Sequence, residues 1–179
     1  MLFLNCCGLY QFIWKDIRQM KSNMENIKIK LNGGMMPKKA TPFDAAYDMY
    51  VPEDVFVNNG RQKIDLKFSI ELPHGYAAMI RARSGFSIRG IDVYNATIGI
   101  ESRLDASVIT GLVDEKFRGS VGVILHVFDE RTKYFSYVIK KGTRIAQMQI
   151  VAVPDTELVE SDKLDMTDDR GGGFGHTNK

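Results

Sequence analysis

Cysteine is scarce in this chain of 179 residues, and the only two, Cys6 and Cys7, are adjacent. Adjacent cysteines can form neither a disulfide framework nor a zinc site with CxxC spacing, which favours a cytoplasmic or other reducing intracellular compartment. An excess of one charge is also missing, because 24 Lys and Arg residues face 22 Asp and Glu residues. A net charge of +2 does not indicate nucleic acid as a partner, so any phosphate chemistry must be local.

Long hydrophobic runs are absent as well. The apolar stretch at residues 1–14 is shorter than the roughly 20 residues that cross a bilayer, and it lacks the charged start and cleavage site of a signal peptide. We therefore expect no membrane partner. We expect the fold to begin near Met24, with residues 1–23 a leader or extension outside it. The alternative is an N-terminal helix packed on the domain.

The sequence after Met24 also lacks the pattern of an amphipathic helix, since no long apolar stripe with 3.6-residue spacing is present there. Residues 27–31 instead alternate between polar and apolar side chains, as a half-buried strand does. Similar short runs, separated by glycine- and proline-containing turns, follow at 65–70, 76–81, 120–128, 134–139 and 145–153. The pattern predicts an all-β sandwich, jelly roll or small barrel over residues 24–166, followed by a flexible Gly-rich arm at 167–179.

Two segments carry groups suited to phosphate or metal chemistry. Asp48 lies just inside an expected strand, where most such carboxylates only end a strand or a turn. Arg83, Ser84 and Gly85 follow the strand expected at 76–81. Guanidinium, hydroxyl and backbone N–H groups together are the donors that a polyphosphate needs, although solvated arginines before a turn are common.

Two further segments combine a polar side chain with an apolar run. Asp114 ends the run at 111–113 and is followed by Phe117. Such a carboxylate can hold and polarise a water as a general base, or simply begin a hairpin turn. Gln147 is a polar residue in an otherwise apolar strand, so its amide must find hydrogen-bond partners.

The arm is the fifth segment, because Arg170 and Phe174 stand there among glycines. This composition suits an arm that orders over a ligand, with the ring on a base and the guanidinium on phosphate. From about residue 27 to the end, the order and spacing of the five segments resemble those of the trimeric dUTP pyrophosphatases (dUTPases). The most specific matches are residues 83–85, 111–114, 142–147 and 170–175.

The resemblance implies a distorted jelly-roll or β-clip homotrimer with active sites at subunit interfaces. It implies hydrolysis of dUTP to dUMP and diphosphate with Mg²⁺, which limits uracil in DNA and supplies dUMP for dTMP synthesis. It further implies that Asp114 orients the water that attacks the α-phosphorus and that Asp48 reaches the metal through water. Substrate-binding roles are implied for Arg83, Ser84, Gly85, Gly111, Leu112, Val113, Phe117, Gln147, Arg170, Phe174, Gly175, His176 and Thr177.

According to these implied roles, each segment would contact a different part of the nucleotide. Residues 111–113 would read uracil, largely through backbone groups, whereas residues 83–85 and Gln147 would line the phosphates. The arm of a third subunit would close the site, with Phe174 over the uracil. Arg170, His176 and Thr177 would then lie near the terminal phosphates.

The sequence departs from the family pattern at two single positions and in the arm. Phe117 stands where a tyrosine is usual, and Thr143 where an acidic residue is usual. The arm has one residue fewer between Arg170 and Phe174, which shortens its reach by about 3.5 Å at full extension.

The largest departure is a longer segment between Gly85 and Gly111, which exceeds the usual length by roughly ten residues, a modest entropic burden at a surface. The extra part lies within 94–108, and Val108 stands where an asparagine is often found. It is either a surface extension or a change in base specificity.

Two other functions fit parts of the pattern. A dCTP deaminase shares this fold, but its catalytic glutamate and its serine and arginine pattern are not seen. A catalytically quiet, nucleotide-binding regulatory relative would fit the changes at Phe117, Thr143 and the arm. Asp114 is present, which favours the hydrolase.

Overall fold

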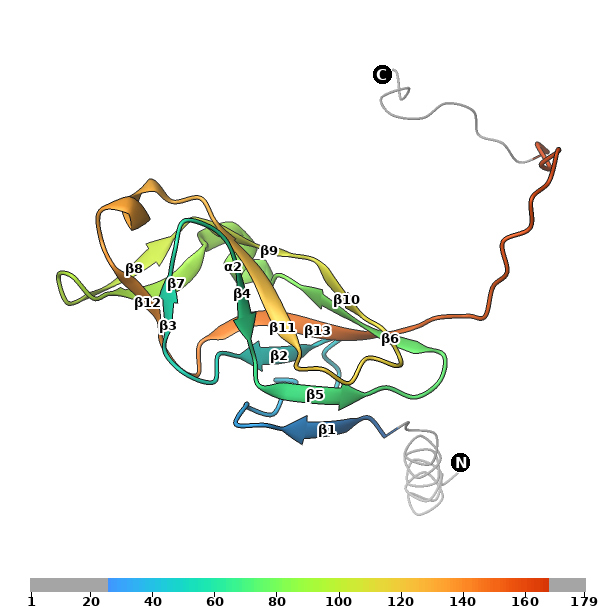
Figure 1. Cartoon of the computed structure of the whole chain (residues 1–179), viewed down its shortest axis with the longest axis horizontal. Coiled ribbons are helices and arrows are strands. Elements are labelled where there is room, and N and C mark those ends of the chain that lie inside the picture. The colour runs from blue at the N-terminus through green and yellow to red at the C-terminus, as the bar shows by residue number, and fades with distance from the viewer. Residues whose placement is uncertain (1–25, 168–179) are drawn as a thin grey trace, which may run out of the picture.

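The computed structural model describes residues 26–167, so the expected leader and nearly all of the arm lie outside the described residues (Figure 1). Short strands dominate, and the predicted all-β class is confirmed. The strands are β1 (Lys28–Leu31), β2 (Tyr47–Tyr50), β3 (Val55–Val57), β4 (Gly60–Asp65), β5 (Phe68–Glu71), β6 (Tyr76–Arg81), β7 (Ile91–Asn95), β8 (Ile100–Leu104), β9 (Ala106–Ile109), β10 (Gly111–Val113), β11 (Gly122–Val127), β12 (Tyr137–Ile139) and β13 (Arg144–Ala152). The helices are α2 (Ser84–Arg89) and the 3₁₀ helix η1 (Glu130–Lys133). No helix within residues 26–167 is long and apolar enough to cross a membrane.

The strand pairs are antiparallel and form four small sheets. One sheet has the order β10-β6-β13-β2, a second β4-β11-β9, a third β3-β12-β7-β8, and β1 pairs with β5. Apolar side chains from these sheets meet in one core, in which Met49, Leu66, Val123 and Leu125 are fully buried. The first sheet matters most for function, because β2, β6, β10 and β13 carry or adjoin most of the expected site residues.

Several expected strands have different bounds for identifiable local reasons. The strand expected at 65–70 is interrupted, because Asp65 Oδ1 accepts the backbone N–H of Lys67 at 2.9 Å and Lys67 adopts a positive φ of 55°. The run at 134–139 begins to pair only at Tyr137, because the Asp129 side chain caps η1 and turns the preceding chain into a 3₁₀ helix. The strand at 76–81 is observed with the expected bounds.

The longer segment at 94–108 folds as a β-hairpin continued by a strand. Strands β7 and β8 pair from Ile91 with Leu104 to Asn95 with Ile100. Asn95 is buried, and its Oδ1 accepts the backbone N–H groups of Thr97 and Ile98 at 3.0 and 3.3 Å, which shapes the turn. The segment in which we expect the extra residues is therefore built from paired strands rather than from a loose loop.

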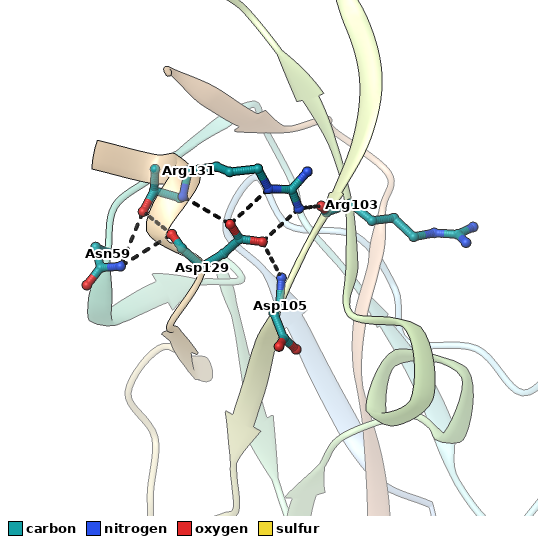
Figure 2. Close-up of polar contacts among 6 residues, drawn as sticks. Asn59, Arg103, Asp105, Asp129 and Arg131 are labelled. Atoms are coloured by element: carbon teal, nitrogen blue, oxygen red, sulfur yellow. Dashed lines mark hydrogen bonds and ion pairs between the residues drawn. The ribbon is translucent and has the colours of Figure 1, made fainter. Parts of the chain in front are cut away.

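A polar network holds the point where this hairpin passes into β9 (Figure 2). Asp129 accepts the backbone N–H of Asp105 at 3.0 Å and hydrogen bonds from the backbone and guanidinium of Arg131. Arg131 also donates to the backbone carbonyl of Arg103, and Asn59 Nδ2 donates to the Asp129 carbonyl. The Arg131 guanidinium holds the pKa of Asp129 well below its usual range, although partial burial opposes this shift. The β8–β9 junction is thus tied to η1.

The hairpin also depends on Gly90, between α2 and β7. Gly90 has a φ of +75°, and a Cβ there would lie 2.1 Å from the backbone carbonyl oxygen of Leu104. We expect Gly90→Ala to lower the free energy of unfolding by at least about 2 kcal/mol in urea denaturation, because strain and a backbone clash combine. Gly60→Ala is the matched control, since Gly60 has a φ of +86° but nothing within 4 Å of its Cβ position. Equal losses in the two variants would contradict the role assigned to the Leu104 contact.

Candidate active site

The expected phosphate-binding residues meet where β6 ends. In the β2-β13-β6 part of the sheet, Gln147 pairs with Asp48 on one side and with Arg81 on the other. Paired residues project from the same face of the sheet, so Asp48, Gln147 and Arg81 lie side by side on one face. Arg83 follows two residues after Arg81, and Ser84 is the first residue of α2. The half-buried Gln147 donates from Nε2 to the Ala82 carbonyl at 3.1 Å, which supplies the partner that its position requires.

Arg144 joins this row because of a β-bulge. Arg144 and Gln147 are three residues apart, which would place them on opposite faces of a regular strand. The register of β13 against β2 shifts between Arg144 and Ala146, so Arg144 pairs with Tyr50 and shares the face of Asp48. Sequence reasoning did not select Arg144 as a site residue, because a bulge inside an alternating run leaves no clear sequence signal.

Asp48 connects the two arginines. Its Oδ1 accepts from Arg83 Nε at 2.8 Å, and its Oδ2 lies 3.2 Å from a terminal nitrogen of Arg144. The Asp48 side chain is only 15% exposed, and each of its carboxylate oxygens faces a guanidinium group. Asp48 therefore orients both arginines, and its carboxylate is not free to be a direct metal ligand without breaking an ion pair.

The expected base-reading residues line a separate cleft of about 240 Å³. The structure brings five of the expected site residues together along it: Gly111, Leu112, Val113, Asp114 and Phe117. The remaining lining residues were not predicted: Lys63, Ile80, Ile109, Ser120, Val121, Gly122 and Ile124.

Exposed apolar side chains stand at this cleft. Leu112 is 61% exposed and Phe117 is 42% exposed. A planar ligand that covered them would remove apolar surface from water, which is favourable. Val108 does not line the cleft, because it is buried in β9 opposite Leu125, and the neighbouring Ile109 lines it instead.

Asp114 begins a tight turn, in which the Phe117 N–H donates to the Asp114 carbonyl at 3.0 Å. The Asp114 side chain is exposed, so it is accessible to water and to a ligand. Glu115 anchors this turn to the β5–β6 loop, because its Oε2 accepts the Gly75 N–H at 3.0 Å and lies 3.0 Å from Nδ1 of His74. The Gly75 hydrogen bond and then His74 lower the pKa of Glu115. Both readings of Asp114 are compatible, since a residue that begins a turn can also present its carboxylate.

Within one chain the two subsites lie far apart. Strand β10 runs antiparallel to β6 with Gly111 opposite Ile80 and Val113 opposite Ala78, so Asp114 falls near Ala77 at the start of β6, whereas Arg83 lies beyond the end of β6. The register places about six strand residues between them, which corresponds to about 20 Å. Adjacent phosphates of one nucleotide cannot bridge that distance. The structure thus brings together the expected residues within each subsite but does not bring Asp114 together with residues 83–85 of the same chain.

The expected arm residues Arg170, Phe174, Gly175, His176 and Thr177 lie outside the described residues. The chain leading to them is described, however. After β13 the N–H of Val153 donates to the Gly75 carbonyl at 2.7 Å, and every residue from 152 to 167 is exposed. This segment extends away from the sheets (Figure 1).

The fold and the sequence define the class to which the chain belongs. A sequence model of the dUTPase family matches residues 32–178. The chain is 36% identical over 146 residues to the deoxyuridine 5'-triphosphate nucleotidohydrolase of Anaplasma marginale, covering 79% of this chain and 88% of that one. It is 34% identical over 145 residues to the protein of that name from a Hydrogenobaculum strain, covering 79% and 89%. This chain therefore belongs to the dUTPase family.

The fold agrees with solved dUTPase structures. The dUTPase of Staphylococcus bacteriophage 80alpha, solved with dUPNHPP, superposes with a TM-score of 0.69 at 22% identity, covering 87% of this chain and 100% of that chain. A mutant dUTPase from phage phi11 of S. aureus, in which a structural Mg(II) ion is coordinated, superposes with a TM-score of 0.64 at 19% identity, covering 78% and 98%.

Proposed function

We propose that this chain, as a dUTPase, is a dUTP diphosphatase that hydrolyses dUTP to dUMP and diphosphate in a reducing intracellular compartment. This activity limits uracil in DNA and supplies dUMP for dTMP synthesis. The observation that carries the proposal is the cleft formed by Gly111–Val113 with Asp114 at its edge. A family match over residues 32–178 supports it.

Asp114 acts on the attacking water. Its carboxylate accepts a proton from the water as the oxygen approaches the α-phosphorus, and the bond from that phosphorus to the bridging oxygen of the β-phosphate breaks. Diphosphate leaves with the bridging oxygen and its electrons. Phosphoryl transfer needs positioning and charge stabilisation rather than a covalent intermediate, so one carboxylate is enough to activate the water while the other site residues position the phosphates and balance their charge.

The active enzyme is a homotrimer in which each active site is assembled between subunits. The separation of about 20 Å between Asp114 and Arg83 supports this arrangement, because a single chain cannot present both to one substrate. The cleft of one subunit holds uracil and deoxyribose, with Phe117 beside the sugar. Residues 83–85 and Gln147 of a neighbouring subunit bind the phosphates.

The residues present would hold Mg²⁺ together with the triphosphate rather than in a protein-only site. No group of three or more His, Cys, Asp or Glu side chains in residues 26–167 is arranged to hold a metal ion. Mg²⁺ commonly keeps several waters and binds through substrate phosphates, so a single carboxylate contact through water fits this chain. Asp48 is the residue proposed to make that contact. When bound, the ion neutralises charge on the phosphate chain.

The division of the chain into a leader (1–23), a β domain (24–166) and a closing arm (167–179) belongs to the same proposal. The arm residues Arg170, Phe174, Gly175, His176 and Thr177 complete the site over a bound nucleotide. No nucleic acid and no membrane is needed as a partner. The hairpin β7–β8 extends the domain without entering the cleft, since none of its residues lines it.

Diphosphate release from dUTP with Mg²⁺ tests this function directly. We expect release at a rate at least a hundred times that with dCTP, because the backbone groups of a preformed cleft can reject a base whose exocyclic donor and acceptor are exchanged. Removing Mg²⁺ with a chelator is expected to abolish release. Ammonia release from dCTP would instead identify a deaminase, and nucleotide binding without turnover would identify a regulatory relative.

A further inference from the structure

The side chains of Arg83, Arg89, Arg103 and Arg144 line a second, smaller pocket of about 40 Å³ next to the expected phosphate-binding residues. Its other lining residues include Gly85, Asp92 and Thr143. One water molecule needs roughly 10–15 Å³ of pocket volume. This pocket therefore accepts a group the size of one phosphate but is too small for a nucleobase. We propose that this pocket binds the end of the substrate's phosphate chain and that Arg103, from the inserted hairpin, is one of its ligands. The inference rests on the proposed function for the identity of the substrate.

The charges around the pocket favour an anion. Two carboxylates partner three of the arginines: Asp48 pairs with Arg83 and Arg144, and Asp92 pairs with Arg103 Nε. The four guanidinium groups and two carboxylates together give the surroundings of this small pocket a net charge of +2. Asp92 engages Nε, and the two terminal nitrogens of Arg103 make no hydrogen bond within residues 26–167, so they are available as donors to a ligand.

Arg89 supplies a second donor from α2. A Cβ on Gly85 would lie 2.8 Å from a terminal nitrogen of Arg89, so the guanidinium lies directly against the backbone of the 83–85 segment. Arg89 makes no ion pair with a carboxylate of residues 26–167. The absence of a side chain at Gly85 thus lets this cation approach the phosphate-binding backbone.

The inserted hairpin holds Arg103 in place. The carbonyl of Arg103 accepts from Arg131, and the N–H of Asp105 donates to Asp129 at 3.0 Å. Figure 2 shows the Arg103 side chain directed away from this network. The network therefore fixes the backbone on one side, while the guanidinium reaches the pocket on the other.

Two departures from the dUTPase pattern meet at this pocket. Thr143, which replaces the usual acidic residue, lines it and contributes no negative charge. Arg103 comes from the segment that is longer than usual. Both changes make the pocket more favourable for an anion, which gives the insertion a role in binding rather than only at the surface.

Calorimetric titration with inorganic diphosphate tests the proposal without relying on turnover. We expect Arg103→Gln to weaken diphosphate binding roughly ten-fold, the loss typical of one charge-assisted hydrogen bond at a partly exposed site. Arg103→Lys is expected to recover part of the affinity, because it keeps the charge and loses the planar fork. Binding of dUMP, which lacks the terminal phosphates, is expected to remain unchanged.

Arg61→Gln is the matched control, because it removes the same charge from exposed β4 outside the pocket. Unchanged diphosphate affinity in Arg103→Gln, or an equal loss in Arg61→Gln, would overturn the proposal. Arg89→Gln, on a different element, gives the same test if the hairpin variant unfolds. Failure of dUTP turnover together with Arg103-dependent diphosphate binding would reject the proposed function and leave the pocket intact.

Discussion

Replacing Asp114 with asparagine is expected to lower kcat for dUTP hydrolysis by about 10²–10⁴-fold, the range that a positioned general base contributes. Asparagine keeps the size and the turn but cannot accept a proton from the attacking water. The Asp114 side chain is exposed and makes no hydrogen bond in the described structure that the substitution would break. Stability and binding of a non-hydrolysable dUTP analogue should therefore change little.

The measurements are steady-state diphosphate release with Mg²⁺ and calorimetric binding of the analogue. Asp155→Asn is a suitable control, because Asp155 is an exposed carboxylate that lines a neighbouring cavity with Asp114 but does not line the base cleft. We expect this control to retain the wild-type rate. An Asp114→Asn enzyme with the wild-type rate would contradict the water-activation role.

Expected site residues that belong to one local segment lie together in the structure. Residues 111–114 and Phe117 line one cleft because they belong to a single strand and its turn. The expectation that Gln147 must find a partner is also confirmed, by the Ala82 carbonyl. A polar side chain inside an apolar strand needs a hydrogen-bond partner wherever the strand is placed, so a single sequence is enough to predict that requirement.

The sequence did not reveal the residues that reach the site through strand register or through pairing between distant strands. Arg144 faces Asp48 only because β13 contains a bulge, and a one-residue shift in register moves a side chain to the other face. Arg103 reaches the pocket of Arg83 because β8 folds back on β7. Ile109, not Val108, lines the cleft for the same kind of reason.

The strand bounds show where local side-chain bonds override an alternating pattern. Asp65 accepts the Lys67 N–H, so the backbone turns inside the run expected at 65–70, and Asp129 accepts the Arg131 N–H, so η1 forms and delays the strand expected at 134–139. An aspartate within an alternating run is therefore a better sign of a strand end than the run itself indicates. The same reasoning supports the turn at Asp114, where the chain leaves β10.

Deleting residues 170–179 is expected to lower kcat for dUTP by at least about a hundred-fold, because a cation supplied to the phosphates and the exclusion of water are both lost. Assembly should be affected far less, because every strand and every cleft residue that the structure describes within residues 26–167 stays in place. The exposed segment at 152–167 stays, and its apolar side chains Leu158, Leu164 and Met166 remain available to pack on a neighbouring subunit. Diphosphate release measures the first effect and light scattering the second.

A second variant separates the side chains from the length of the arm. Replacing residues 170–179 with Gly and Ser keeps the reach of the chain but removes Arg170 and Phe174. We expect this variant to be nearly as slow as the deletion, because the proposed function assigns closure of the site to the Phe174 ring on the base and the Arg170 guanidinium on phosphate. Wild-type turnover by either variant would reject the closing role, whereas loss of the proposed trimer in both would show that the arm acts in assembly.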